Sequence, residues 1–358
     1  MKILLLADGR SLHAVRYQGE LQRRGLTVVF ASIENGVTVD VPLRPMTGIR
    51  GLNYLLAARK IRHLVEREAP DIIDAHSASG YGYTAAVAGV SEQVPVLLHC
   101  LGSDILISAK KSTYHRMRVG TALEKSSHVI VDSHYLEAQA RAIAPSMKAD
   151  VVYWGAEDAV FDLHDANREL KDFSKVRPVK GLVPRPHEGV YNNQFIIRAL
   201  NGLINKGKIT LTFPDWGTHR KEFDALLGRE CHSGTVQMYS RLPRMDYIRY
   251  LGGFDMYLSA SQSDSSPASL IEAMAAGLVP IVADIPGVRE LVGPDNALLF
   301  DPGNERSLRK AVAELLSGQT DVRKIINNNR NLALAQGRFS DNIDRTIAIM
   351  KQLVTDGC

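Results

Sequence analysis

Residues 255–302 contain the pattern that most restricts how this chain can fold. The alternating apolar segment Met256–Ala260 predicts a strand, a small polar loop follows at Ser261–Pro267, and good helix formers occupy Ala268–Ala276. A glycine ends the helix, and a second apolar strand is predicted at Val279–Ala283. A strand, a helix and a strand in this order predict a βαβ unit of a parallel sheet. Its loop lies at the carboxyl edge of the sheet, where such sheets bind ligands.

Two acidic residues flank the start of this predicted helix. Asp264 lies in the loop, and Glu272 follows about one turn into the helix, with seven residues between them. The unpaired N–H groups of the first turn, from Ala268 to Leu270, and the helix dipole together favour a bound anion. Ser269 could cap this helix or contact a phosphate. We therefore expect an anion site with both carboxylates facing one crevice.

The rest of the chain repeats the alternation of strands and helices, which predicts two doubly wound α/β domains. The first half opens with KILLLA at residues 2–7, which is apolar on both faces, and a helix pattern follows at His13–Arg24. The second half restarts with a strand at Val179–Val183, after a polar linker near Leu163–Ser174. Further strands are predicted at 28–32, 71–74, 94–99, 129–132, 151–153, 209–213, 236–239 and 297–300, and further helices at 53–68, 195–206, 305–317, 320–336 and 341–354.

Composition excludes several classes of protein. With 45% hydrophobic and 23% charged residues and a net charge of +4, the chain is typical of a globular protein and not of a dedicated nucleic-acid binder. Cys100, Cys231 and Cys358 are too far apart for a CxxC metal site and suit a reducing compartment. No apolar run is long enough for a signal peptide or a membrane span, so we expect a cytoplasmic protein. The first turn lacks GxGxxG, which argues against a nicotinamide enzyme.

The acid-x7-acid pair, followed by SLIEAMAAG, VPIVA, RELV and N-LLF-P, resembles the donor-nucleotide motif of retaining glycosyltransferases of the GT-B fold, broadly family 4 or group 1. The resemblance implies two Rossmann-like doubly wound domains facing a central cleft. An acceptor-binding domain would cover residues 1–163 and a nucleotide-sugar-binding domain 164–338, and a last helix within 339–358 would cross back to the first domain. The alternative is an ordinary Rossmann-like half-domain whose helix merely carries an acid.

The resemblance also implies an activity. The enzyme would transfer a hexose-type sugar from a UDP- or GDP-linked donor to a glycan or lipid-linked acceptor, with retention, in cell-surface polysaccharide synthesis. It would use no cofactor and no metal ion, so helix N–H groups and Arg or Lys would have to neutralise the leaving diphosphate. Two alternatives stay open, a GT-B sugar-nucleotide epimerase and a nucleotide-sugar-binding protein without turnover.

Specific donor roles follow from the resemblance. Glu272 would accept hydrogen bonds from the ribose hydroxyls, and Asp264 would lie near the donor sugar, where relatives usually have glutamate. The usual Arg–Lys pair of the family is absent. Arg185, in R-x-x-E-x-x-Y-N, fits the pattern of a subset of relatives and would contact the diphosphate. Arg241, in MYSRLP, would line the base pocket, chiefly through its backbone.

In the first domain, LLHCLGSDI resembles the family's loop that reaches the donor sugar. His99 is therefore a catalytic candidate, or else a structural histidine at a strand end. Asp104 would cap the following helix or orient an acceptor hydroxyl. No residue is a convincing nucleophile, which favours front-face transfer in which the leaving phosphate takes the acceptor proton. The acceptor-side candidates follow predicted strands and are Gly9, Arg10, His13 and His76.

Two basic runs lie in the first half of the chain. One interpretation is a pair of solvated helix faces, and the other is a patch for a phosphorylated acceptor or for anionic lipid, which would hold the protein peripherally at the inner membrane face. The only acidic residue within the first run is Glu66, and the only one within the second is Glu124. The runs consist of Arg44, Arg50, Arg59, Lys60, Arg62 and Arg67, and of Lys110, Lys111, Arg116, Arg118 and Lys125.

Overall fold

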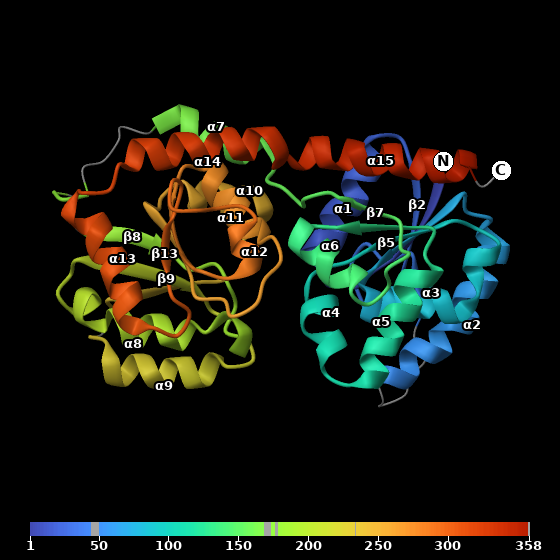
Figure 1. Ribbon diagram of the computed structural model, residues 1–358, viewed down its shortest axis with the longest axis horizontal. Coiled ribbons are helices and arrows are strands. Elements are labelled where there is room, and N and C mark those ends of the chain that lie inside the picture. The colour runs from blue at the N-terminus through green and yellow to red at the C-terminus, as the bar shows by residue number, and fades with distance from the viewer. Residues whose placement is uncertain (44–49, 168–172, 176–177, 233, 357–358) are drawn as a thin grey trace. The chain divides into compact units, whose positions relative to one another are not determined.

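The structure, a computed structural model, describes the chain apart from residues 44–49, 168–172, 176–177, 233 and 357–358 (Figure 1). The chain forms two compact units. The first contains Met1–Tyr153 and Ser340–Cys358, and the second contains Trp154–Phe339.

The division between the units falls earlier than the boundary expected at Leu163. Helix α7 (Asp158–Asn167) spans that expected boundary, and it packs against helices α10 and α11 of the second unit. Val160 and Phe161 are buried, and their apolar side chains hold α7 in the second unit. The rest of the expected linker lies mostly outside the described residues.

Seven parallel strands form the sheet of the first unit, in the order β3-β2-β1-β4-β5-β6-β7. The central strands are apolar on both faces because helices cover both sides of the sheet. Strand β3 was not predicted, because it has only two residues and contains Pro42, which a sheet tolerates at its edge. The strands are β1 (Lys2–Leu6), β2 (Thr27–Ser32), β3 (Val41–Pro42), β4 (Ile72–His76), β5 (Val96–His99), β6 (His128–Val131) and β7 (Ala149–Val151).

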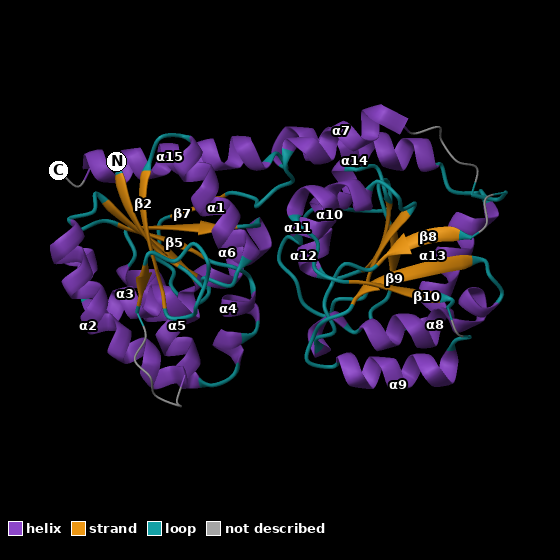
Figure 2. Ribbon diagram, turned by 180° about the vertical axis from the view of Figure 1, so that it is seen from behind, coloured by secondary structure: helices purple, strands orange, loops and turns teal. Residues whose placement is uncertain are grey.

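Helices cover both faces of this sheet. Figures 1 and 2 show α1 and α15 on one side and α2, α3 and α5 on the other. Arg24 fastens α15 to the first unit through Asp344 and the carbonyl oxygen of Ser340, at 2.5 and 2.9 Å. The helices are α1 (Leu12–Arg23), α2 (Arg50–Glu68), α3 (Tyr83–Ala88), α4 (Ser103–Leu106), α5 (Thr113–Lys125), α6 (His134–Arg141) and α15 (Phe339–Asp356), with a π-helical turn at Ser77–Gly82 and 3-10 turns at Val90–Glu92 and Ser108–Lys110.

The second unit has a six-stranded parallel sheet in the order β10-β9-β8-β11-β12-β13. Helices α8, α9 and α13 cover one face, and α10, α11 and α14 the other (Figure 2). The strands are β8 (Val179–Leu182), β9 (Ile209–Pro214), β10 (Val236–Tyr239), β11 (Met256–Ser259), β12 (Val279–Ala283) and β13 (Leu298–Phe300). The helices, besides α7, are α8 (Asn193–Asn205), α9 (Arg220–Glu230), α10 (Arg244–Leu251), α11 (Ala268–Ala275), α12 (Pro286–Arg289), α13 (Glu305–Ser317) and α14 (Val322–Gln336), with a 3-10 turn at Gly189–Tyr191.

The prediction of two Rossmann-like doubly wound sheets is confirmed. In each parallel sheet the strand order reverses at one pair of neighbouring strands, β1 with β4 in the first unit and β8 with β11 in the second, so that successive strands are added outward on either side of that pair. Loops that follow such a pair diverge to opposite faces, and they leave a crevice at the carboxyl edge of the sheet. Functional residues are therefore expected at the carboxyl edges of these two strand pairs. None of the described helices combines the length and the apolar character needed to cross a membrane.

Candidate functional site

In the second unit, two loops meet at the carboxyl edge of β8 and β11. The loop after β8 carries Arg185, and the loop after β11 carries Asp264. Nη2 of Arg185 donates a hydrogen bond to Oδ2 of Asp264 at 2.8 Å, and the two side chains are only 17% and 14% exposed. The structure therefore joins two predicted donor-site residues that are far apart in the sequence, in one largely buried ion pair.

The guanidinium of Arg185 is held in a fixed orientation. It stacks on the ring of Tyr191 at 4.1 Å from the ring centre. Burial lowers the pKa of Arg185, but Asp264 and the nearby tyrosines outweigh it, so the pKa lies above its ordinary value. Its Nε is buried and donates no hydrogen bond to any described residue. A buried N–H without an acceptor is costly, so this atom is suited to an anionic ligand oxygen.

The loop that carries Arg185 is anchored to helix α8. Nδ2 of Asn193 donates to the carbonyl oxygen of Arg185 at 2.9 Å. His187 lies 2.7 Å from the carbonyl oxygen of Pro214 through Nε2, so Nε2 carries the proton and Nδ1 accepts from Asn193. A pocket of about 220 Å³ opens beside these residues and is also lined by Glu188. This network positions the guanidinium with little freedom.

The loop that carries Asp264 is equally constrained. Burial raises the pKa of Asp264, and the positive charge of Arg185 opposes the rise, as do bonds from Ser261 and from the backbone of Ser265. Gly287, in α12, packs directly against this loop, because a Cβ at this position would lie 2.0 Å from the carbonyl oxygen of Asp264. Only glycine permits this close approach of two backbone segments.

Helix α11 begins at the crevice as the sequence predicts. Its N-cap is Pro267, whose side chain makes no capping hydrogen bond. Ser269 is therefore not the cap, and its hydroxyl instead lies 3.1 Å from the hydroxyl of Tyr257. Ala268, Ser269 and Leu270 form the first turn of the helix. The N–H of Leu270 already donates to the carbonyl oxygen of Pro267 at 2.9 Å, so the N–H groups of Ala268 and Ser269 are the ones that the helix start leaves without an intrahelical acceptor. An anion can be bound there.

Glu272 faces an arginine that the sequence analysis missed. Glu272 is 5% exposed, and its Oε1 accepts a hydrogen bond from Nη2 of Arg244 at 2.5 Å. Nε of Arg244 also donates to Glu157, so one guanidinium joins two carboxylates. Arg244 begins α10, far from the motif in sequence, and no spacing rule relates it to Glu272. The chain thus supplies a cation that fixes the orientation of the predicted ribose-binding carboxylate.

Arg241 lies in an exposed part of the second unit. Its guanidinium is 5.3 Å from the ring centre of Trp216, which in turn meets Tyr239 edge-on at 5.4 Å between ring centres. Trp216 follows β9, Tyr239 is the last residue of β10, and Arg241 follows β10. The aromatic pair was not predicted, although a tryptophan directly after a strand could have suggested it.

In the first unit, the loop after β1 carries Gly9, Arg10 and, in the first turn of α1, His13. Gly9 packs against Gly36, where a Cβ would lie 2.0 Å from the carbonyl oxygen of Gly9. Arg10 is exposed and pairs with Asp8 at 2.8 Å, and His13 is exposed. Arg10 and His13 therefore lie on the surface near the carboxyl edge of the sheet, whereas Gly9 is buried.

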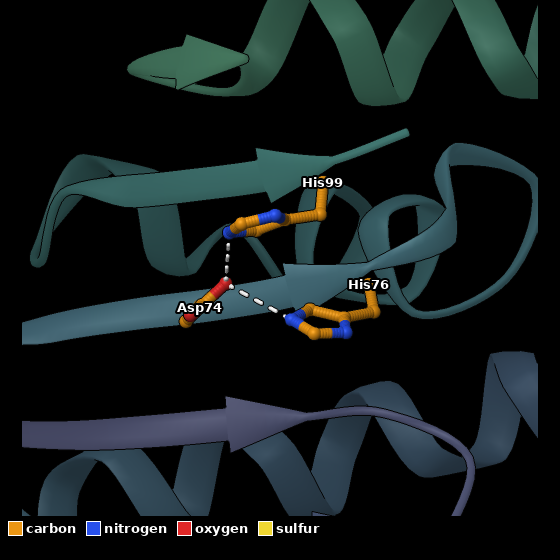
Figure 3. A group of neighbouring side chains, drawn as sticks. All are labelled: Asp74, His76 and His99. Atoms are coloured by element: carbon orange, nitrogen blue, oxygen red, sulfur yellow. Dashed lines mark ion pairs between the residues drawn. The ribbon is translucent and has the colours of Figure 1, made fainter. Parts of the chain in front are cut away.

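Two of the predicted site histidines, His76 and His99, lie in the interior of the first unit and not at its surface. His76 is 4% and His99 is 5% exposed, and both face Asp74, which is fully buried (Figure 3). Tyr17 donates a hydrogen bond to Oδ2 of Asp74 at 2.6 Å. Burial raises the pKa of Asp74 to about 7 and lowers the pKa of His99 to about 3. The structure thus places His99, the predicted donor-sugar contact, and His76, the predicted acceptor contact, in the interior of the first unit.

Asp104 is a structural residue at the start of α4. It is 1% exposed, and its carboxylate accepts hydrogen bonds from the backbone N–H groups of Ala78, Leu101 and Ile105 at 2.7, 3.1 and 3.1 Å. These bonds join the loops that follow β4 and β5. Its oxygens are therefore occupied by backbone N–H groups at the start of α4.

The basic runs are partly engaged in the fold. Arg62 and Arg118 donate to the carbonyl oxygens of Ala88 and Ser79, at 3.0 and 2.9 Å. Arg44 lies outside the described residues, and nothing is described of the side chain of Arg50. A pocket of about 580 Å³ lies between α2 and β3. Its lining is apolar with a basic margin and consists of Val41, Pro42, Leu43, Leu56, Arg59, Lys60, His63, Leu64 and Arg67.

Comparisons with known proteins agree with this arrangement. Residues 2–133 match a family described as glycosyl transferase 4-like, and residues 189–332 match the glycosyl transferases group 1. The second match contains the loop with Asp264 and helix α11 with Glu272. The two matches thus cover most of each unit.

Two curated relatives are similar in sequence. One is assigned provisionally as the teichuronic acid biosynthesis glycosyltransferase TuaC of Bacillus subtilis, with 26% identity over 266 residues, which are 72% of this chain and 64% of that protein. The other is an uncharacterized glycosyltransferase of Methanocaldococcus jannaschii, with 25% identity over 78% of this chain and 75% of that protein. The chain thus matches less than two thirds of the length of TuaC.

A solved structure has the same fold. Anabaena HepE in complex with UDP-glucose superimposes with a TM-score of 0.78 and 18% identity, over 97% of this chain and 99% of that one. This likeness confirms the predicted GT-B fold.

Proposed function

This chain belongs to the family 4-like, group 1 glycosyltransferases, and we propose that it transfers a hexose-type sugar from a nucleotide-sugar donor to a glycan or lipid-linked acceptor. The observation that carries this proposal is the buried Arg185–Asp264 pair at the carboxyl edge of β8 and β11. A buried guanidinium N–H without an acceptor is suited to an anionic donor. The similarity to TuaC supports a place in cell-surface polysaccharide synthesis.

In this proposal, positively charged and N–H groups bind the diphosphate of the donor, and carboxylates bind its ribose and sugar hydroxyls. Arg185 and the first turn of α11 neutralise the leaving diphosphate, because both offer N–H groups where negative charge develops. Glu272 accepts hydrogen bonds from the ribose hydroxyls, and Arg244 holds its carboxylate in place. Asp264 contacts the donor sugar through the oxygen that it does not share with Arg185. UDP is the favoured nucleotide, because HepE has a similar fold and was solved with UDP-glucose.

Transfer itself proceeds without a protein nucleophile in this proposal. The acceptor oxygen attacks the anomeric carbon on the face that the phosphate leaves, and the configuration is retained. The bond to the leaving phosphate breaks, and an oxygen of that phosphate takes the proton of the acceptor hydroxyl. Positive charge at Arg185 stabilises the departing diphosphate throughout. No metal ion is part of this step.

The acceptor belongs to the first unit in this proposal. Gly9, Arg10 and His13 lie at its carboxyl edge, where sheets of this kind bind ligands. The apolar pocket between α2 and β3, with Arg59, Lys60 and other basic residues at its margin, supports peripheral contact with an anionic lipid surface.

Substitution of Glu272 tests the donor site. Isothermal titration of UDP and GDP, and a transfer assay with pooled UDP- and GDP-sugars, compare the wild type with Glu272→Ala. We expect the variant to keep its fold and to lose transfer and most nucleotide affinity. Glu222→Ala, at an exposed position of α9, is the matched control and should behave as the wild type. Near-normal turnover in Glu272→Ala would refute the assignment, and release of an epimerised free sugar nucleotide would indicate an epimerase.

A further inference from the structure

Three potential metal ligands converge inside the first unit, away from its exposed loops. Oδ1 of Asp74 lies 3.3 Å from Nε2 of His99 and 3.6 Å from Nε2 of His76. All three atoms lie within 4.8 Å of one another, and the side chains point toward a common centre (Figure 3). The donor-site chemistry of the second unit uses none of these residues.

The separations fit a bound ion better than a hydrogen-bonded network. Zinc ligands lie roughly 2.0–2.2 Å from the ion, so neighbouring ligand atoms of a tetrahedral site are about 3.3–3.6 Å apart. The two distances from Asp74 match this edge length. Oδ1 of Asp74 is buried and accepts no hydrogen bond from any described residue. A buried carboxylate oxygen without a donor is costly, and a cation would remove that cost.

The backbone holds these ligands in place before any ion binds. Asp74 and His76 are two residues apart on β4 and therefore face the same side of the sheet. His99 ends β5 and is paired in register with His76. Ligands on neighbouring strands are more rigid than ligands on loops, so little order is lost on binding. The sequence distance between the two strands explains why no spacing motif reveals the group.

Tyr17 completes the surroundings of the group. From α1, its hydroxyl reaches Oδ2 of Asp74 at 2.6 Å and lies 3.5 Å from Nε2 of His99. The hydrogen bond orients the carboxylate so that Oδ1 faces the two imidazoles, as outer partners of metal ligands do. The same hydroxyl is close enough to act as a fourth ligand.

We propose that Asp74, His76 and His99 form a binding site for one divalent transition-metal ion of the zinc class, with Tyr17 as its orienting partner. Two imidazoles and one carboxylate are the ligands that zinc, cobalt(II) and iron(II) accept. The site is closed to solvent, which is typical of a structural ion that stabilises the fold. The proposal does not depend on the donor site, and it leaves transfer without a catalytic metal.

Metal content of the full-length protein without a histidine tag tests this proposal. We expect about one equivalent of metal per chain by plasma mass spectrometry after purification or after zinc reconstitution. Removal by a chelator should lower the Tm, and added zinc should restore it. Cobalt(II) should give the intense visible bands of a four-coordinate site.

Variants separate this site from adventitious binding. Asp74→Asn and His99→Gln should lose the metal, whereas His63→Gln, at an exposed position of α2, should keep it. If the buried variants fail to fold, the cobalt spectrum of the wild-type protein decides. Metal content well below one equivalent after reconstitution, an octahedral cobalt spectrum, or full retention of metal in folded Asp74→Asn would each overturn the proposal. UDP binding is measured in parallel, so failure here is distinct from failure of the donor-site proposal.

Discussion

Replacing Arg185 by Met removes the positive partner of Asp264 while keeping an unbranched apolar stem against Tyr191. At the observed 2.8 Å, two unit charges attract by about 6 kcal/mol with an effective dielectric constant of about 20. Desolvation of both groups offsets part of this attraction. Removing one partner of a buried pair typically costs about 3–5 kcal/mol. We expect a loss of about 3 kcal/mol at pH 8, because both side chains keep some exposure.

The loss should depend on pH in a defined direction. Burial already raises the pKa of Asp264, and removal of Arg185 raises it further. In the variant, the folded state then holds the proton on Asp264 more tightly than the unfolded state does. The variant is therefore less destabilised at pH 5 than at pH 8, because the loss grows as the pH rises from the unfolded-state pKa of the carboxyl through its raised folded-state pKa.

Urea unfolding followed by tryptophan fluorescence measures this effect. Both tryptophans, Trp154 and Trp216, lie in the second unit and report its unfolding. Adding Asp264→Asn to Arg185→Met should recover more than half of the lost stability, because no uncompensated charge then remains. UDP affinity should not recover, because the diphosphate still lacks its cation. Equal losses at pH 5 and pH 8, or full recovery of UDP binding in the double variant, would refute the reasoning.

Two further substitutions test the supports of the donor site. Gly287→Ala places a Cβ 2.0 Å from a carbonyl oxygen of the loop after β11. It should lower the free energy of unfolding by about 1–3 kcal/mol and weaken UDP binding, whereas Gly202→Ala in α8, where the space is open, should be neutral or slightly stabilising by thermal melting. Arg244→Met leaves Glu272 without its cation and should raise the donor KM in steady-state assays. Arg249→Met, at an exposed position of the same helix, is the control and should leave the donor KM nearly unchanged. An unchanged KM in Arg244→Met would mean that Glu272 does not depend on this cation.

Local patterns were sufficient for the elements that carry the site. The helix predicted at Ala268–Ala276 is α11, which ends one residue earlier. It could be predicted because good helix formers are followed by Gly277, which has a left-handed conformation and ends the helix. The strand expected at 151–153 is instead β7, two residues earlier, because an edge strand has only one neighbour to fix its ends. Patterns of this kind depend on neighbours in sequence, and they fail where a short edge strand such as β3 is held only by tertiary pairing.

The side-chain partners required the folded chain. Asp264 and Glu272 could be singled out by spacing, because both belong to one local motif with seven residues between them. Arg244 could not, because only the packing of α10 against the same face brings it to Glu272. His99 could be placed at a strand end, but its direction could not be predicted, since a strand residue can point to either face of the sheet. The structure points it inward to Asp74.

The sequence by itself therefore determined the two doubly wound sheets and the family resemblance, because apolar periodicity and a local motif specify both. Only the tertiary structure decided which charges meet, since contacts between strands and loops distant in sequence leave no periodic trace. For the stretch at 255–302, the motif specified a helix start and two carboxylates. The structure paired the predicted Arg185 with Asp264 and added Arg244 as the partner of Glu272.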